Sequence, residues 1–165
     1  MPPAVSSSLA ASPSASATSP RSRGARLARL VLLVLLAVAF VFAGAMHFVV
    51  PQFYEQIIPP SLPLRHLAVI LSGIAEMLLG VLVLVPRTRK LAAWGIVLLL
   101  VVVFPANIYM AVSNVQLVGL PEGMAQPSVA GRYARLPFQL VFIAWAWLFT
   151  RDEPAAEPPA VAPVA

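Results

Sequence analysis

The sequence predicts an all-α integral membrane protein, built as a four-helix bundle with disordered termini. Two observations support this prediction, the overall composition and the grouping of the apolar residues. The chain of 165 residues is 60% hydrophobic, has a mean hydropathy of +0.89 and contains only 10% charged residues. Soluble domains carry about 25% charged residues, so this composition cannot cover a water-facing surface. The apolar residues also form four long runs, as lipid-facing helices require.

The four apolar runs define the predicted membrane spans. A helix needs about 20 apolar residues to cross a hydrocarbon core of about 30 Å, and the first three runs meet that length. The fourth is long enough only if its helix begins near Arg132, with Pro137 suited to its first turn and its arginines reaching toward the headgroups. The predicted spans are about 30–50, 67–85, 91–112 and 132–150.

The two ends of the chain differ from this apolar middle. Residues 1–26 are mostly Ser, Ala and Pro, and residues 152–165 are rich in Ala and Pro. Such segments bury too little apolar surface to offset the entropy of ordering, so we expect both to be disordered tails. The membrane domain is then predicted to cover residues 27–151.

Two local features of the first span and its following loop leave alternatives open. The stretch Ala43–Ala45 resembles a signal-peptidase site, although the apolar run continues beyond it. The loop over residues 51–66 contains several prolines, and its apolar residues favour either a short interfacial helix or a self-shielded loop. These apolar loop residues are Phe53, Tyr54, Ile57 and Ile58.

The basic residues predict that both termini lie in the cytoplasm. The chain has 11 basic and 6 acidic residues, for a net charge of +5. Cytoplasmic segments of membrane proteins carry an excess of Lys and Arg, and an N-in, C-in topology gives that asymmetry here. The predicted inner basic residues are Arg21, Arg23, Arg26, Arg29, Arg87, Arg89, Lys90 and Arg151. The predicted outer ones are Arg65, Arg132 and Arg135.

Several functional classes are not expected from this sequence. The basic residues do not form a face with interleaved aromatic residues, so we expect no nucleic-acid partner. The absence of cysteine excludes disulfides and Cys-ligated metal centres within the chain. His47, Glu76 and His66 offer at most three ligands without a spacing motif, so no metal site is predicted. No nucleotide-binding or nucleophile motif occurs, and no catalytic activity can be read from the sequence.

Glu76 is an acidic residue within the second predicted span. At about 1.5 Å per residue it lies about 14 Å deep, near the bilayer midplane. An acid at that depth costs about 3 kcal/mol, so it usually has a partner or a functional role. Ser72, Glu76 and Gly80 share one helix face at four-residue spacing. Two interpretations stay open, a functional site and a protonated glutamate that only joins helices.

Further polar residues are predicted in the outer half of the bundle. Because polar groups cannot face lipid, we expect them to turn inward around a small outer-facing cavity. Structural alternatives stay open: His47 could contact headgroups, Asn107 could bind a carbonyl freed by Pro105, and Arg135 could snorkel. The candidate pocket residues are His47, Ser72, Glu76, Asn107, Tyr109, Arg135 and Gln139.

Four stretches, one in each predicted span, resemble the DoxX family of small four-helix membrane proteins. They are Gly44–Phe48, Ser72–Glu76 with Gly80, Phe104–Met110 and Arg135–Gln139. The resemblance covers about residues 30–150 and implies a four-helix bundle in a bacterial inner membrane. The family takes its name from a subunit of a thiosulfate:quinone oxidoreductase, and some relatives are linked to membrane redox-stress complexes. Many other members have no assigned activity.

Three functions fit these residues. The first is a membrane subunit or accessory protein of a redox complex, in which Glu76 and His47 bind or protonate a quinone-like headgroup. Its electrons would come from a redox partner protein. The second is a non-catalytic binding module for a lipid or small apolar ligand. The third is a small proton-coupled transporter that uses Glu76 and assembles as a homo-oligomer.

Overall fold

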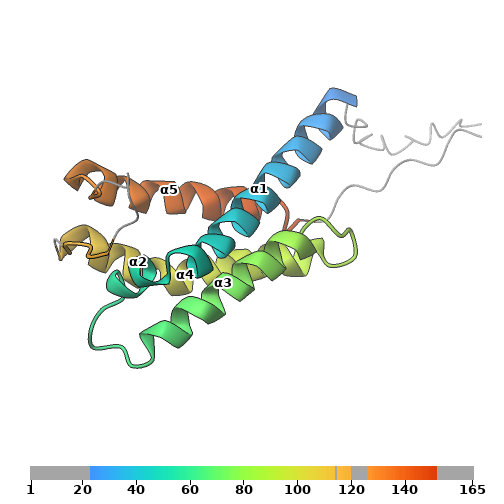
Figure 1. Ribbon diagram of the computed structural model, residues 1–165. Coiled ribbons are helices and arrows are strands. Elements are labelled where there is room, and N and C mark those ends of the chain that lie inside the picture. The colour runs from blue at the N-terminus through green and yellow to red at the C-terminus, as the bar shows by residue number, and fades with distance from the viewer. Residues whose placement is uncertain (1–22, 114, 120–125, 152–165) are drawn as a thin grey trace, which may run out of the picture.

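A computed structural model describes residues 23–113, 115–119 and 126–151. These residues form five helices joined by turns and loops, and they contain no strand (Figure 1). The elements are α1 (Arg23–Val49), α2 (Pro51–Gln56), α3 (Arg65–Leu82), α4 (Arg89–Val112) and α5 (Val129–Trp147). Three of them, α1, α3 and α4, are long and apolar enough to cross a membrane. The prediction of an all-α protein is therefore confirmed, with three helices that meet the requirement for a span.

The helices pack in the order α1, α3, α4, α5, and short α2 contacts both α1 and α3. Figure 1 shows the start of α1, the α3–α4 turn and the end of α5 at one end of the molecule, with α2 at the other. We call the end that carries α2 the cap end. We call the opposite end the basic end, because the described part of it carries Arg23, Arg26, Arg29, Arg87, Arg89, Lys90 and Arg151.

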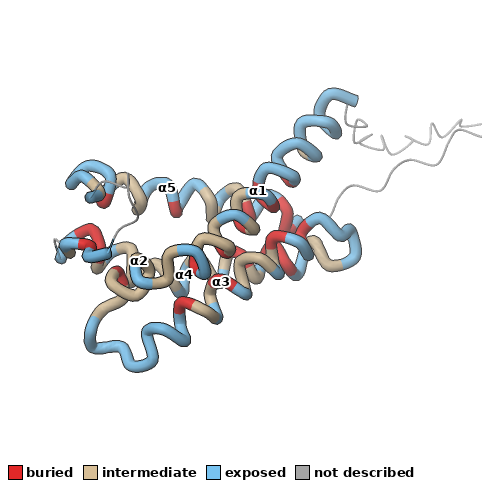
Figure 2. Tube along the Cα trace, in the orientation of Figure 1, coloured by how far each residue is buried: buried red, intermediate tan, exposed pale blue. Residues whose placement is uncertain are grey.

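The outer surface of the helices is strongly apolar. Large apolar side chains are exposed on every long helix, as the pale blue outer faces in Figure 2 illustrate. Examples are Leu30, Phe42, Leu78, Leu98 and Phe138. Soluble monomers rarely expose contiguous apolar patches of this extent, so this surface, together with the three apolar helices, indicates a membrane protein.

The interior contains two separate apolar clusters. The larger lies toward the basic end and combines residues of α1, α4 and α5 with the residues just after α3 and α5, among them Leu36, Phe40, Val83, Ile96 and Phe149. The smaller lies at the cap end, where Ile57, Met110 and Leu117 pack with Phe53, Tyr54 and Val115. The polar residues His47, Glu76, Asn107 and Gln139 lie between these two clusters, and we call this part of the interior the polar level.

Glycines allow α1 and α3 to cross at close range. A methyl group at Gly44 would lie 2.6 Å from the carbonyl oxygen of Gly73, and one at Gly73 would lie 2.7 Å from Cβ of His47. Real Cβ atoms do not approach other atoms this closely, so only glycine fits at either position. Small residues of this kind let membrane helices pack backbone to backbone.

The turn between α3 and α4 satisfies the carbonyls at the end of α3 with side chains from its own sequence. Thr88 Oγ1 donates to the carbonyl of Leu82 at 2.8 Å, and Arg89 Nε donates to that of Val83 at 3.2 Å. The last carbonyls of a helix have no intrahelical partner, and these two donors replace water there.

Three predicted boundaries need correction. α1 begins at Arg23, so Arg23–Arg26 are helical and not part of a disordered tail, while residues 1–22 and 152–165 lie outside the described residues. α3 ends at Leu82, short of the predicted residue 85. α5 begins at Val129 and ends at Trp147, which puts Pro137 inside the helix and not in its first turn. The reason is Ser128, whose Oγ accepts from the Gly131 amide at 3.0 Å and starts the helix earlier.

The glycine crossing predicts a specific stability difference. Gly44→Ala should reduce the free energy of unfolding by about 1–3 kcal/mol, the usual range for forced overpacking, because the added methyl group meets backbone atoms of α3. Thermal unfolding in detergent micelles measures the effect. Gly95→Ala is the matched control, since its methyl group meets only the flexible end of Leu79. Equal melting temperatures for the two variants would contradict the proposed role of the crossing.

Candidate functional site

His47 and Glu76 face each other across the α1–α3 contact. His47 Nδ1 lies 3.5 Å from Glu76 Oε2, and their side chains are only 8% and 12% exposed. The same Nδ1 lies 2.9 Å from the carbonyl oxygen of Ala43. A carbonyl can only accept, so Nδ1 carries a hydrogen, and in the neutral ring Nε2 is the accepting nitrogen. The Nδ1 hydrogen is thus directed to Ala43 and not to Glu76.

The carboxyl group of Glu76 is left incompletely bonded. Its Oε2 is buried and receives no hydrogen bond from any residue that the structure describes. An unpaired buried acceptor costs about 1–3 kcal/mol, and more when it is charged. The site therefore has an unmet requirement for a donor at this atom, which a ligand hydroxyl, an amine or a water molecule can supply.

Two aromatic residues of α2 cover the His47–Glu76 pair. The Tyr54 ring stacks on the His47 ring with 3.7 Å between centroids, and the Phe53 ring meets Tyr54 edge-on at 5.2 Å. The guanidinium of Arg135, from α5, lies over the Phe53 ring at 5.5 Å. Contacts between neighbouring side chains thus run continuously from α5 through α2 to α1 and α3.

Tyr54 lies within reach of both charged residues of this group. Burial raises the pKa of the Tyr54 hydroxyl, the charge of Glu76 raises it further, and the charge of Arg135 opposes these effects. The hydroxyl therefore stays protonated at neutral pH and can donate a hydrogen bond. Tyr54 therefore adds a hydroxyl donor to the site, next to the His47 ring on which it stacks.

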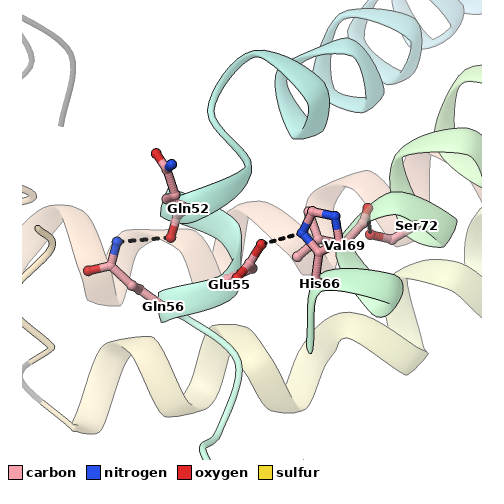
Figure 3. Close-up of polar contacts among 6 residues, drawn as sticks. All are labelled: Gln52, Glu55, Gln56, His66, Val69 and Ser72. Atoms are coloured by element: carbon pink, nitrogen blue, oxygen red, sulfur yellow. Dashed lines mark hydrogen bonds and ion pairs between the residues drawn. The ribbon is translucent and has the colours of Figure 1, made fainter. Parts of the chain in front are cut away.

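α2 is held in place by polar contacts on two sides. On one side the exposed His66, in the first turn of α3, lies with Nδ1 2.6 Å from Glu55 Oε1, as Figure 3 shows. On the other, Gln56 forms a pair of hydrogen bonds with the backbone of Val118, at 2.7 and 3.0 Å. These contacts fix α2 over the polar residues at the cap end.

A second polar pair joins α4 to α5. Asn107 Nδ2 donates to Gln139 Oε1 at 2.7 Å, and Gln139 Nε2 donates to the carbonyl of Leu100. Pro105 lacks the amide that would normally bond within this stretch of α4, so carbonyls near it need other donors. Asn107 thus bonds to Gln139 of the neighbouring helix, and Gln139 bonds to the Leu100 carbonyl one residue before the carbonyl that Pro105 leaves free.

The predicted pocket residues divide into three groups. His47, Glu76 and Arg135 lie in one set of contacts with α2, whereas Asn107 and Gln139 form a separate pair. Ser72 Oγ donates to the carbonyl of Val69 in its own helix (Figure 3), and its hydroxyl does not bond to the other pocket residues that the structure describes. Tyr109 is half-buried, and no side-chain contact within the described residues joins it to the site.

Phe53 and Tyr54 are site residues that the sequence did not single out. The loop composition predicted a short helix as one of two alternatives, and α2 confirms that alternative. Nothing in the local pattern indicated that this helix lies over His47. The signal that could have suggested it is the placement of two aromatic residues only a few positions beyond an intramembrane histidine.

The described residues contain no group of three or more His, Cys, Asp or Glu side chains that could hold a metal ion. His66, the third candidate ligand, binds Glu55 at the surface and not His47. The chemistry available at the site is hydrogen bonding and proton exchange by His47, Glu76 and Tyr54, next to the cation of Arg135.

The Asn107–Gln139 pair predicts a measurable coupling. Gln139→Leu should lower the free energy of unfolding by about 1–3 kcal/mol, because it removes the hydrogen bonds of Gln139 with the Asn107 amide and with the Leu100 carbonyl. Asn107→Leu in the same chain should restore part of that loss, since one orphaned group is removed. Thermal unfolding in micelles compares these variants with Gln116→Leu at an exposed position. Additive effects of the two substitutions would argue against the pair.

Comparisons with known proteins identify a family but not an activity. The family model described as a domain of unknown function, DUF8561, matches residues 36–150. No curated protein and no solved structure matches significantly. The matched segment covers most of the chain and includes α2, the His47–Glu76 pair and the Asn107–Gln139 pair, so the chain belongs to the DUF8561 family.

Proposed function

We propose that this protein is a DoxX-like, multi-pass protein of the cell membrane, with four spans and both termini in the cytoplasm. The basic end supports the orientation, because Lys and Arg concentrate on the cytoplasmic side of membrane proteins. α5 is the fourth span in this proposal. Its lower hydropathy is offset because Gln139 is buried against α4 and Arg135 lies over the α2 ring of Phe53.

The topology can be tested because the chain lacks cysteine. A single cysteine introduced at Ser61, in the exposed loop at the cap end, should react with a membrane-impermeant maleimide added to intact cells. A cysteine at Arg87, in the turn at the basic end, should react only after the membrane is opened. Mass-shift gels read out the labelling. The reverse pattern would show that the basic end faces outward.

We further propose that the site binds the headgroup of a quinone-like ligand as part of a membrane redox complex. The observation that carries this proposal is the buried Oε2 of Glu76, which lacks a hydrogen bond and faces His47 at 3.5 Å. Ligand sites of this kind combine mostly apolar walls with a few placed polar groups, and the rings of Phe53 and Tyr54 supply such walls here.

The residues of the site suit proton exchange with such a headgroup. A quinone, when bound, supplies two-electron chemistry that requires protons. Glu76 is placed to give or take a proton at Oε2, and Tyr54 can donate a hydrogen bond. The Ala43 carbonyl holds the His47 ring in one orientation, which leaves Nε2 as the nitrogen that accepts. Electrons come from a partner protein in this proposal, because the chain has no cysteine to ligate a redox centre.

The alternative is a binding module for a lipid or small apolar ligand without chemistry. The same aromatic cover favours it, since stacked rings next to a histidine and a carboxyl group bind a headgroup whether or not it reacts. The two functions differ in whether the ligand is redox-active and whether a dehydrogenase-type partner accompanies the protein.

Co-purification distinguishes these functions. The protein purified in mild detergent should carry a quinone or a redox partner, detected by mass spectrometry, and Glu76→Gln should lower the occupancy about tenfold or more, as expected when a charge-assisted hydrogen bond is lost. Glu55→Gln is the comparison variant: it weakens the contact of α2 with His66 but leaves the Glu76 carboxyl group in place, so it should lower the occupancy much less.

Each outcome has a distinct meaning. A retained lipid with no quinone and no partner indicates the binding module, and proton flux in liposomes that Glu76→Gln abolishes indicates transport. If the Glu76→Gln protein keeps every ligand and partner, Glu76 serves only to join α1 and α3.

A further inference from the structure

Arg135 presents a cation to the site with no anion opposite it. The residue lies in the second turn of α5, is half-buried, and places its guanidinium over the Phe53 ring. Among residues 23–113, 115–119 and 126–151 it forms no ion pair and no hydrogen bond. A partly buried charge without a partner is costly, so the position favours an anion supplied from elsewhere.

The described acidic residues do not neutralise it. They are Glu55 and Glu76 only, and Glu55 binds His66 at the surface. Glu76 faces His47 at 3.5 Å and forms no ion pair with Arg135. Phe53 also directs the guanidinium toward α2, which lies over the site, whereas a snorkelling arginine extends toward the headgroups without such a contact.

We propose that Arg135 and the Tyr54 hydroxyl form a subsite for an anionic oxygen on the headgroup of the bound ligand. The inference rests on the proposed ligand-binding function and specifies its ligand class. Carboxylates, phosphate esters and the ionised hydroxyl of a hydroxyquinone share this chemistry. Guanidinium binds all of them through its fork of N–H donors, and Tyr54 adds one O–H donor.

The arrangement also sets the direction in which the headgroup lies. Glu76 repels an anion, whereas its unpaired Oε2 accepts from a hydroxyl or amine. The anionic oxygen is therefore held beside Arg135 and Tyr54, and any donor group of the same headgroup points toward Glu76 and His47.

Matched probes test the anion requirement. The full-length protein in phosphatidylcholine nanodiscs is titrated with an alkyl hydroxynaphthoquinone, ionised at neutral pH, and with its neutral methyl ether, and quenching of tryptophan fluorescence reports binding. A second pair is cis-parinaric acid and its methyl ester. The ionised member of at least one pair should bind about tenfold more tightly than its neutral partner, as expected for one charge-assisted contact. Equal affinities within both pairs would overturn the proposal.

Substitutions assign that preference to Arg135. Arg135→Gln should remove the tenfold difference, Arg135→Lys should retain most of it, and Arg65→Gln, an exposed arginine at the cap end, should leave it unchanged. If Arg135→Gln does not fold, Tyr54→Phe replaces it and should weaken the ionised probe alone. A folded Arg135→Gln or Tyr54→Phe protein with the full preference overturns the subsite.

Two further comparisons separate the sources of the anion and the two proposals. Phosphatidylglycerol added to the nanodiscs displaces the ionised probe if the natural anion is a lipid headgroup, and does not if it is a free amphiphile; either result supports the shared chemistry. If the subsite proposal is wrong but the proposed function is right, Glu76→Gln will weaken probe binding and Arg135→Gln will not. If the proposed function itself is wrong, neither Glu76→Gln nor Arg135→Gln will change the affinity for the probes.

Discussion

The close crossing of α1 and α3 is the constraint on which the rest of the site depends. Gly44 and Gly73 allow the two backbones to touch, and only at that separation do short side chains such as His47 and Glu76 reach each other across the interface. The same crossing places the end of α1 so that α2 turns back over the pair. One steric condition in the backbone thus brings Glu76 of α3 to His47 and to the α2 segment that follows it.

The interior is organised in levels, with polar residues between two apolar clusters. The cluster at the basic end consists of well-packed aliphatic and aromatic side chains and gives the helices a common core. The cluster at the cap end is small and depends on α2. In a medium without water, the polar level between them must satisfy its own hydrogen bonds. Asn107 and Gln139 bond to each other, whereas Glu76 Oε2 is buried without a hydrogen bond from the described residues.

The sequence predicted the helical class and the polar residues better than it predicted their pairing. Apolar runs located α3 and α4 closely, because span length is a direct consequence of bilayer thickness. The start of α5 was wrong, since Ser128 caps the helix before the apolar run begins. For the site, the sequence placed Arg135 and Gln139 in one pocket, but it could not indicate that they meet different partners. The sequence could not predict that α2 lies over His47. The stacking of Tyr54 on His47 depends on how the chain turns after Val49 and not on any periodic pattern.

The turn between α3 and α4 has a consequence for how the protein enters the bilayer. Thr88 and Arg89 bond the Leu82 and Val83 carbonyls from within the turn, so these carbonyls at the end of α3 need neither headgroups nor another part of the chain. Two apolar helices joined in this way form a self-contained unit that can insert together during synthesis. The glutamate on α3 would then be carried into the membrane inside a hairpin, and its shielding from lipid would begin before the last helix has left the ribosome.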